Sequence, residues 1–171
     1  MIKGRTHDIN LIDTMESKIE PMVETYAHYT LNYNNWFGKR QGKTSKNNLI
    51  ETAFLYLNSP YLWGGKTPFG IDCSGFTQMV YKLNGYELLR DASQQATQGD
   101  PLSFIEESEP GDLAFFDNAD GDIIHVGIIM KDNYIIHAHG KVRIDRLDHS
   151  GIYNVDRNLH THKLRVIKKV V

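Results

Sequence analysis

Residues 61–76 read Tyr-Leu-Trp-Gly-Gly-Lys-Thr-Pro-Phe-Gly-Ile-Asp-Cys-Ser-Gly-Phe, and this stretch organises the rest of the chain. It contains the single cysteine of the sequence, Cys73. Asp72 is a favourable N-cap, because its carboxylate can accept hydrogen bonds from the free backbone N–H groups of a helix's first turn. The apolar residues that follow recur with helical spacing, at Phe76, Met79, Val80 and Leu83. The stretch therefore predicts a helix that begins at Cys73.

This helix is expected to end near Gly85, since glycine tolerates the left-handed conformation that closes helices. At its start, the unpaired N–H groups and the helix dipole favour a thiolate at Cys73 over a thiol. The thiolate is the form that attacks carbonyl carbons, so Cys73 is a candidate nucleophile. The alternative is a small buried hydrophobic residue, as most free cysteines are. The preceding loop, rich in glycine and proline, favours the reactive interpretation.

The composition excludes several classes of protein. A chain of 171 residues with 40% hydrophobic content predicts one domain with a packed core. The net charge of -2 gives no electrostatic case for binding nucleic acid or a membrane surface. No apolar run approaches the ~18 residues of a membrane span, and one cysteine excludes a disulfide framework or a multi-cysteine zinc site. The first residues, Met-Ile-Lys-Gly-Arg, lack an apolar stretch, so we expect no secretory signal in this chain.

Residues after Pro110 show the period-two pattern of strands. Strands are expected at residues 113–116, 123–130, 134–139, 142–147 and 164–171. Before them, Ser45 is expected to cap a helix. The apolar face of that helix is predicted to be Leu49, Ile50, Ala53, Phe54 and Leu57. Helices followed by antiparallel strands predict an α+β domain in which the N-terminal helices pack on one sheet.

Two histidines lie on neighbouring strands of this expected sheet. His125 begins one strand and His137 lies in the next, after a tight turn. Because neighbouring strands are about 5 Å apart, two histidines on one face of such a hairpin can touch. One ring would then accept the Cys73 proton, and the second ring would hold the first ring in place. The alternative for each histidine is a structural or exposed residue.

The same strands suggest a metal site as a competing hypothesis. His139 lies on the strand face of His137, so His125, His137 and His139 are three candidate zinc ligands. This alternative lacks the carboxylate or second motif of most metal hydrolases, and it leaves Cys73 without a role unless the thiol is a ligand too. We therefore expect no metal and no other cofactor. Three further histidines in polar, loop-like sequence are expected at the surface: His149, His160 and His162.

Four motifs in order resemble those of the NlpC/P60 family, papain-like cysteine peptidases of bacterial cell walls. They are Asp-Cys-Ser-Gly-Phe (72–76), Gly-Asp-Leu-Ala-Phe-Phe (111–116), His-Val-Gly-Ile (125–128) and Ile-Ile-His-Ala (135–138). The resemblance implies that Cys73 is the nucleophile, His125 the general base and later acid, and His137 the third, orienting member. It also implies that Tyr61 helps the backbone N–H of Cys73 to hold the oxyanion. The alternative for Tyr61 is an aromatic residue at the rim of the site.

Within the family, the chain resembles the γ-D-glutamyl-L-diamino acid endopeptidases, which cut the bond between D-glutamate and the diamino acid of murein peptides. The resemblance implies a thioester intermediate and peptidoglycan stem peptides as substrates, with either lysine or meso-diaminopimelate as the diamino acid. The expected substrate-binding residues are Trp63, Asp72, Ser74 and Ser93. Asp72 would pair with the free amine of an N-terminal L-alanine, so that peptides lacking it are rejected. The competing role of Asp72 and Ser93 is helix capping.

Residues 1–45 are expected to be an N-terminal appendage and linker, with a remnant of an SH3-like domain as one interpretation. Residues 46–171 are expected to form the catalytic domain. We expect a monomer in the cell envelope, periplasmic or secreted, with cytoplasmic murein recycling as the alternative. Two further hypotheses are a thiol amidase or transpeptidase on the same scaffold and a catalytically silent wall-binding module.

Overall fold

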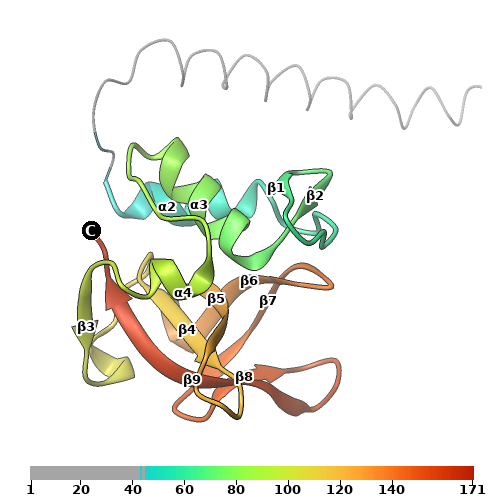
Figure 1. The fold of residues 1–171 in the computed structure, drawn as a ribbon, viewed down its shortest axis with the longest axis vertical. Helices are drawn as coiled ribbons and strands as arrows, with labels where there is room; N and C mark the ends of the chain where they lie inside the picture. The colour runs from blue at the N-terminus through green and yellow to red at the C-terminus, as the bar shows by residue number, and fades with distance from the viewer. Residues whose placement is uncertain (1–42, 44) are drawn as a thin grey trace, which may run out of the picture. The chain divides into compact units, whose positions relative to one another are not determined.

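The structure is a computed structural model that describes residue 43 and residues 45–171 (Figure 1). The appendage expected over residues 1–45 therefore lies outside the described residues, apart from Lys43 and Ser45. In the described residues, three helices precede the main strands: α2 (Asn47–Phe54), α3 (Cys73–Leu83) and α4 (Ala92–Gln95). The short strands β1 (Lys66–Thr67) and β2 (Gly70–Ile71) form a hairpin between α2 and α3. No helix in this part of the chain has the length and apolar content needed to cross a bilayer.

Helix α3 begins and ends as its sequence predicts. The Asp72 carboxylate accepts a hydrogen bond from the Gly75 backbone N–H at 2.6 Å, which satisfies one of the free donors of the first turn. At the other end, Gly85 has a φ of +82°, the left-handed conformation that closes a helix. Phe76 and Val80 on the predicted apolar face are fully buried. The predicted N-cap and both helix boundaries are confirmed.

Helix α2 starts differently from the prediction. Its N-cap is Lys46, which makes no side-chain capping bond, so the expected cap at Ser45 is wrong. The Lys46 ammonium instead contacts the buried carboxylate of Asp112 at 2.6 Å, and this ion pair fixes the start of the helix. Phe54 and Leu57, expected on the buried face, are 44% and 38% exposed. The helix ends at Phe54, and the turn that follows carries Leu57 away from the core.

Seven antiparallel strands form the main sheet, in the order β3-β9-β4-β5-β6-β7-β8. They are β3 (Asp100–Leu102), β4 (Leu113–Asp117), β5 (Ile123–Ile129), β6 (Tyr134–His139), β7 (Lys141–Asp148), β8 (Gly151–Asn154) and β9 (Leu159–Lys169). The short 3₁₀ helices η1 (Ile105–Glu107) and η2 (Lys131–Asn133) lie between strands. Strand β9 pairs with β4 and also with β8, which closes β4 to β9 into a barrel. The predicted α+β class is confirmed, whereas β3, β8 and the first residues of β9 were not expected.

Two apolar cores lie on opposite faces of this sheet. Helix α3 contacts β5 and β6, and the helices lie along one side of the strands (Figure 1). The helix-side core joins residues of α2 and α3 to alternate residues of the strands, among them Leu49, Phe76, Val80, Phe115, Val126 and Ile136. The barrel-side core contains the other alternate residues, among them Ala114, Phe116, Ile129, Ile135 and Leu147. This alternation determines which strand residues can face the start of α3.

Candidate active site

Cys73 occupies the first turn of α3 and is 7% exposed. Its sulfur lies within hydrogen-bonding reach of the backbone N–H of Val126 in β5, and of the N–H groups of Cys73 and Ser74. Burial raises the pKa of the thiol above its usual value, with a further increase from the Asp72 charge, and the three N–H groups do not offset this increase. The N–H groups at the helix start therefore favour the thiolate, as the sequence predicts, but burial outweighs them and the net shift of the thiol pKa is upward.

The two predicted histidines meet across strands β5 and β6. His125 Nε2 lies 2.8 Å from His137 Nδ1, and the rings are nearly perpendicular with centroids 5.0 Å apart. Gly127 pairs directly opposite His137, and a Cβ at Gly127 would stand 2.9 Å from the His137 Cβ. A glycine at this position therefore makes room for the His137 side chain. The expected contact between the two histidines is confirmed.

A buried carboxylate continues this contact into β7. His137 Nε2 lies 3.0 Å from Asp145 Oδ2, and both side chains are fully buried. Arg143 holds the same carboxylate with two hydrogen bonds, from Nε at 2.7 Å and from Nη2 at 2.8 Å, and also contacts Asp156. Burial raises the pKa of Asp145, but the hydrogen bonds from His137 and Arg143 outweigh it and leave the pKa below its usual value. Asp145 was not identified from the sequence, because it becomes a neighbour of His137 only through the register of β6 and β7.

Two further imidazoles surround His125. The ring of His162, in β9, stacks on His125 with centroids 4.1 Å apart, and His139 lies at 6.4 Å. Burial has the largest effect on the pKa of His125 and holds it well below its usual range. The neighbouring rings of His137, His162 and His139 lower this pKa further. Burial also lowers the pKa of His162 to about 3. The expectation that His162 lies at the surface is wrong, because β9 begins early enough to place this residue inside the cluster.

The zinc alternative named three of these histidines. Within the described part of the chain, no three His, Cys, Asp or Glu side chains are arranged to hold a metal ion. The surface position expected for the two remaining histidines is confirmed for His149 and His160, which are 70% and 42% exposed.

The thiol and the imidazoles lie at neighbouring residues of β5 without contacting each other. Cys73 and Val126 belong to the helix-side core, whereas the ring of His125 contacts Phe116 of the barrel-side core. Among the described residues, no hydrogen bond joins the sulfur to His125 or His137. The link between the two groups is the strand backbone, because Val126 directly follows His125. Proton transfer therefore requires the sulfur and the His125 ring to approach each other.

The other polar group at the α3 start is an ion pair. The Asp72 carboxylate accepts hydrogen bonds from the backbone N–H groups of Gly64 and Gly75, and from Arg90 Nη1 at 3.1 Å and Nη2 at 2.6 Å. Burial raises the pKa of Asp72, but Arg90 and the two N–H groups lower it overall. Arg90 also donates to Ser74 Oγ at 2.8 Å. Together with the Ser74 hydroxyl, which donates to Asp72 Oδ1 at 3.5 Å, the backbone N–H groups and Arg90 occupy the lone-pair sites of the carboxylate. Arg90 was not identified from the sequence.

Tyr61 interacts electrostatically with Asp72 and Arg90. Among the described residues, Trp63 makes no interaction with this ion pair. The Tyr61 backbone N–H donates to Gly140 O at 3.0 Å. Burial raises the pKa of the Tyr61 hydroxyl, and the charges of Cys73 and Asp72 raise it further. Trp63 is 85% exposed in the loop before β1.

Ser93 does not cap α4, so the capping alternative is wrong, and its role in substrate binding stays a prediction. It is exposed in α4, the N-cap of that helix is Asp91, and no hydrogen bond involves the Ser93 side chain in the part of the chain that is described. The buried amide of Gln95 instead donates to Ser74 O and to Leu89 O, each at 2.9 Å. The link between α4 and the α3 start is therefore Gln95.

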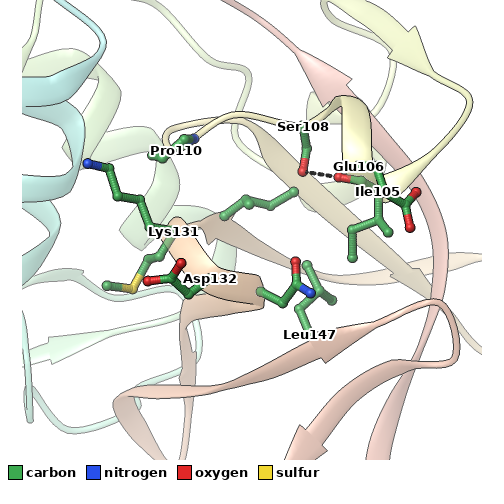
Figure 2. A pocket seen from close by; sticks show the side chains of 10 residues that line it. Ile105, Glu106, Ser108, Pro110, Lys131, Asp132 and Leu147 are labelled. Atoms are coloured by element: carbon green, nitrogen blue, oxygen red, sulfur yellow. Dashed lines mark hydrogen bonds between the residues drawn. The ribbon is translucent and has the colours of Figure 1, made fainter.

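A separate hollow of about 260 Å³ opens at the end of β5 farthest from the imidazoles (Figure 2). Its wall includes Ile105 and Leu147 of the barrel-side core, with the charged side chains of Glu106, Lys131 and Asp132 around it. None of the expected site residues lines this hollow. It is therefore separate from the candidate active site.

Known proteins resemble this chain in sequence and in fold. The γ-D-glutamyl-L-lysine dipeptidyl-peptidase of Bacillus subtilis (strain 168) is 39% identical over 100 residues, which cover 57% of this chain and 33% of that protein. A crystal structure of an NlpC/P60 family protein from Bacillus cereus ATCC 10987 has a TM-score of 0.64 and 29% identity, covering 75% of this chain and 41% of that one. The NlpC/p60 domain of the peptidoglycan hydrolase SagA has a TM-score of 0.59 and 26% identity, covering 74% and 99%.

The chain spans about a third of the length of the curated relatives it matches. The sequence profile of the NlpC/P60 family matches residues 58–160, which include the start of α3 and both histidine-bearing strands. Because this match covers more than half of the chain, and the fold recurs in solved structures of the same family, the chain belongs to the NlpC/P60 family.

Proposed function

We propose that the chain is a cysteine peptidase that hydrolyses the bond between γ-D-glutamate and the diamino acid of peptidoglycan stem peptides. The observation that carries the proposal is the position of Cys73, whose sulfur lies at the start of α3 and against β5 at the residue that follows His125. The name of the B. subtilis relative supports the choice of bond. The proposal assigns residues 46–171 as the catalytic domain and places the protein in the cell envelope.

The proposed reaction begins with a neutral thiol and a neutral imidazole. On substrate binding, the Cys73 S–H proton passes to His125 as the sulfur forms a bond to the γ-carbonyl carbon of D-glutamate. The His125 imidazolium then gives that proton to the amine of the diamino acid as the C–N bond breaks, which leaves a thioester. Water then attacks the thioester carbonyl carbon while His125 takes a proton from it. The C–S bond breaks, the γ-carboxyl group of D-glutamate is released, and His125 returns the proton to the departing Cys73 sulfur, which restores the thiol. Hydrogen bonds of this kind are often long before substrate binds, so the free structure is compatible with this transfer.

The proposed oxyanion donors are the backbone N–H of Cys73 and the hydroxyl of Tyr61. A tyrosine hydroxyl is protonated at neutral pH, so Tyr61 can donate a hydrogen bond to the oxyanion. A preference for a free N-terminal L-alanine would need an acceptor for its ammonium group. Arg90 and backbone N–H groups already donate hydrogen bonds to the Asp72 carboxylate. This preference therefore requires one of these hydrogen bonds to break, so that the substrate's ammonium group can donate in its place.

The proposal is tested by replacing the nucleophile. Cys73→Ala is expected to reduce hydrolysis of L-Ala-γ-D-Glu-diamino acid peptides by a factor on the order of 10⁴ or more. Mass spectrometry of digests would identify the bond, with lysine and meso-diaminopimelate peptides compared, and with free and acetylated N-termini. Ser108→Ala, outside the candidate active site, is the control for folding and assay conditions. Unchanged release of the diamino acid by Cys73→Ala would refute the thiol mechanism.

The product pattern separates the remaining hypotheses. Cleavage at another amide bond would identify a thiol amidase, and incorporation of an added amine would identify a transpeptidase. An intact peptide that binds to the wild-type protein without cleavage would identify a silent wall-binding module. Activity that survives Cys73→Ala and is lost on treatment with a chelator would support the zinc alternative.

A further inference from the structure

Asp145 is the one group in the imidazole cluster whose proton state can be assigned directly. Its side chain is fully buried and accepts two hydrogen bonds from Arg143, one at each oxygen. A guanidinium carries only donors, so both carboxylate oxygens serve as acceptors. The lowered pKa of Asp145 is consistent with an ionised carboxylate. Asp145 therefore presents an acceptor, and no proton, to His137.

That acceptor fixes the proton of the next ring. His137 Nε2 lies 3.0 Å from Asp145 Oδ2, so Nε2 must carry the hydrogen. Burial holds the pKa of His137 below its usual value even though Asp145 opposes this shift, and the ring is therefore neutral. A neutral imidazole has one N–H and one bare nitrogen. His137 Nδ1 is consequently the bare nitrogen and can only accept.

The same reasoning applies to His125. Its Nε2 lies 2.8 Å from the bare Nδ1 of His137, so Nε2 must donate. With His125 neutral, its Nδ1 has no hydrogen and retains a free lone pair. In the described part of the chain, no hydrogen bond reaches His125 Nδ1. The nitrogen left without a proton is the one that can take the proton of a thiol.

We propose that Asp145 is a positioning residue that sets the tautomers of both His137 and His125, so that His125 Nδ1 is the base available to Cys73. This inference rests on the proposed function for the use of that base. If Asp145 could not accept, the chain could run in reverse, with His137 donating from Nδ1 and His125 carrying its hydrogen on Nδ1. In serine proteases, an asparagine in place of the orienting aspartate leaves the geometry intact but presents the wrong tautomer and lowers kcat.

The test is Asp145→Asn, examined by ¹⁵N NMR of the histidine side chains in the free protein. The amide oxygen can accept from Arg143 while the amide nitrogen donates to His137 Nε2, which reverses the hydrogen-bond chain. We expect the wild type to carry its His125 hydrogen on Nε2, and the variant to carry it on Nδ1. We also expect kcat to fall about 10- to 100-fold, as for other orienting partners, with KM unchanged.

The matched control is Asp148→Asn, on the same strand. Asp148 contacts the exposed ring of His160 at 2.8 Å, outside the imidazole cluster, so kcat and the His125 tautomer should not change. A wild-type spectrum with the His125 hydrogen on Nδ1 would overturn the inference, even if Asp145→Asn does not fold. An unchanged His125 tautomer in a folded Asp145→Asn variant would also overturn it.

The two proposals can fail separately. The NMR measurement uses the free protein and does not depend on which bond is cut. If Cys73→Ala keeps full activity while the tautomers switch in Asp145→Asn, the proposed function fails and the positioning role stands. If Cys73→Ala is inactive while Asp145→Asn keeps the wild-type tautomer and kcat, the positioning role fails and the proposed function stands.

Discussion

An arginine–aspartate ion pair lies on each side of the candidate site, and the two ion pairs have different roles. At the start of α3, Arg90 binds both oxygens of Asp72, whose carboxylate also caps the helix. On the barrel side, Arg143 binds both oxygens of Asp145, whose carboxylate also contacts an imidazole. The first pair stabilises backbone structure at the thiol, and the second controls hydrogen positions on neutral rings. Stability should therefore depend more on Asp72, and proton transfer more on Asp145.

The largest expected effect on stability comes from Asp72→Ala. This change removes the helix cap and leaves the Arg90 guanidinium, 29% exposed, without its partner. We expect the free energy of unfolding to fall by about 3 kcal/mol, measured by urea denaturation. Asp72→Asn should lose less, because its amide oxygen can still accept from the Gly75 N–H. The comparison would be wrong if Asp145→Asn destabilised the protein more than Asp72→Ala.

A second test separates the two sides by pH. The pKa values of His125, His137, His139 and His162 are lowered, in each case chiefly by burial. Below a pH of about 6.5 the unfolded chain binds protons at these histidines that the folded chain does not bind, so stability falls as the pH decreases. Each ring that stays neutral contributes a slope of about 1.4 kcal/mol per pH unit.

The two carboxylates respond in a lower pH range. The pKa values of Asp72 and Asp145 are below the usual value of 3.8, so their stabilisation is complete above about pH 4 and is lost as the pH falls further. Urea denaturation between pH 7 and pH 4.5 should therefore report chiefly the imidazole cluster. His149→Asn, at an exposed position outside the cluster, should leave the slope unchanged. Stability that is constant across this range would contradict the assignment of four neutral rings.

The smallest expected effect is that of Ser93→Ala. The exposed Ser93 side chain makes no hydrogen bond among the described residues, so the free energy of unfolding should change by less than about 0.5 kcal/mol. Gln95→Ala should cost about 1–3 kcal/mol, because the buried Ser74 O and Thr77 Oγ1 lose a partner. Thermal or urea unfolding of both variants measures the difference. If Ser93 contacts substrate as the sequence predicts, Ser93→Ala should raise KM without this loss of stability.

The contrast between the two pairs also explains what could be predicted from the sequence. The cap and start of α3 depend on residues within one turn of each other, and the local pattern identified them. The strands from Leu113 to His139 follow from alternation, and the contact between His125 and His137 follows from their tight connection. Arg90 and Asp145 were missed, because their positions depend on a loop path and on strand register that the local pattern does not contain. The strands β3 and β8 are short and include proline, glycine or asparagine, which weakens their pattern.

The candidate site cannot form until β9 has been synthesised. This strand is the last of the described strands to leave the ribosome, yet it pairs with β4 and β8 and supplies the ring that covers His125. A nascent chain that has made Cys73 and both paired histidines therefore still has an open barrel and hydrated imidazoles. The low pKa of His125 can arise only once β9 has paired and its His162 ring has excluded water from His125. The base is thus set by the docking of β9 and not by the synthesis of the histidine itself.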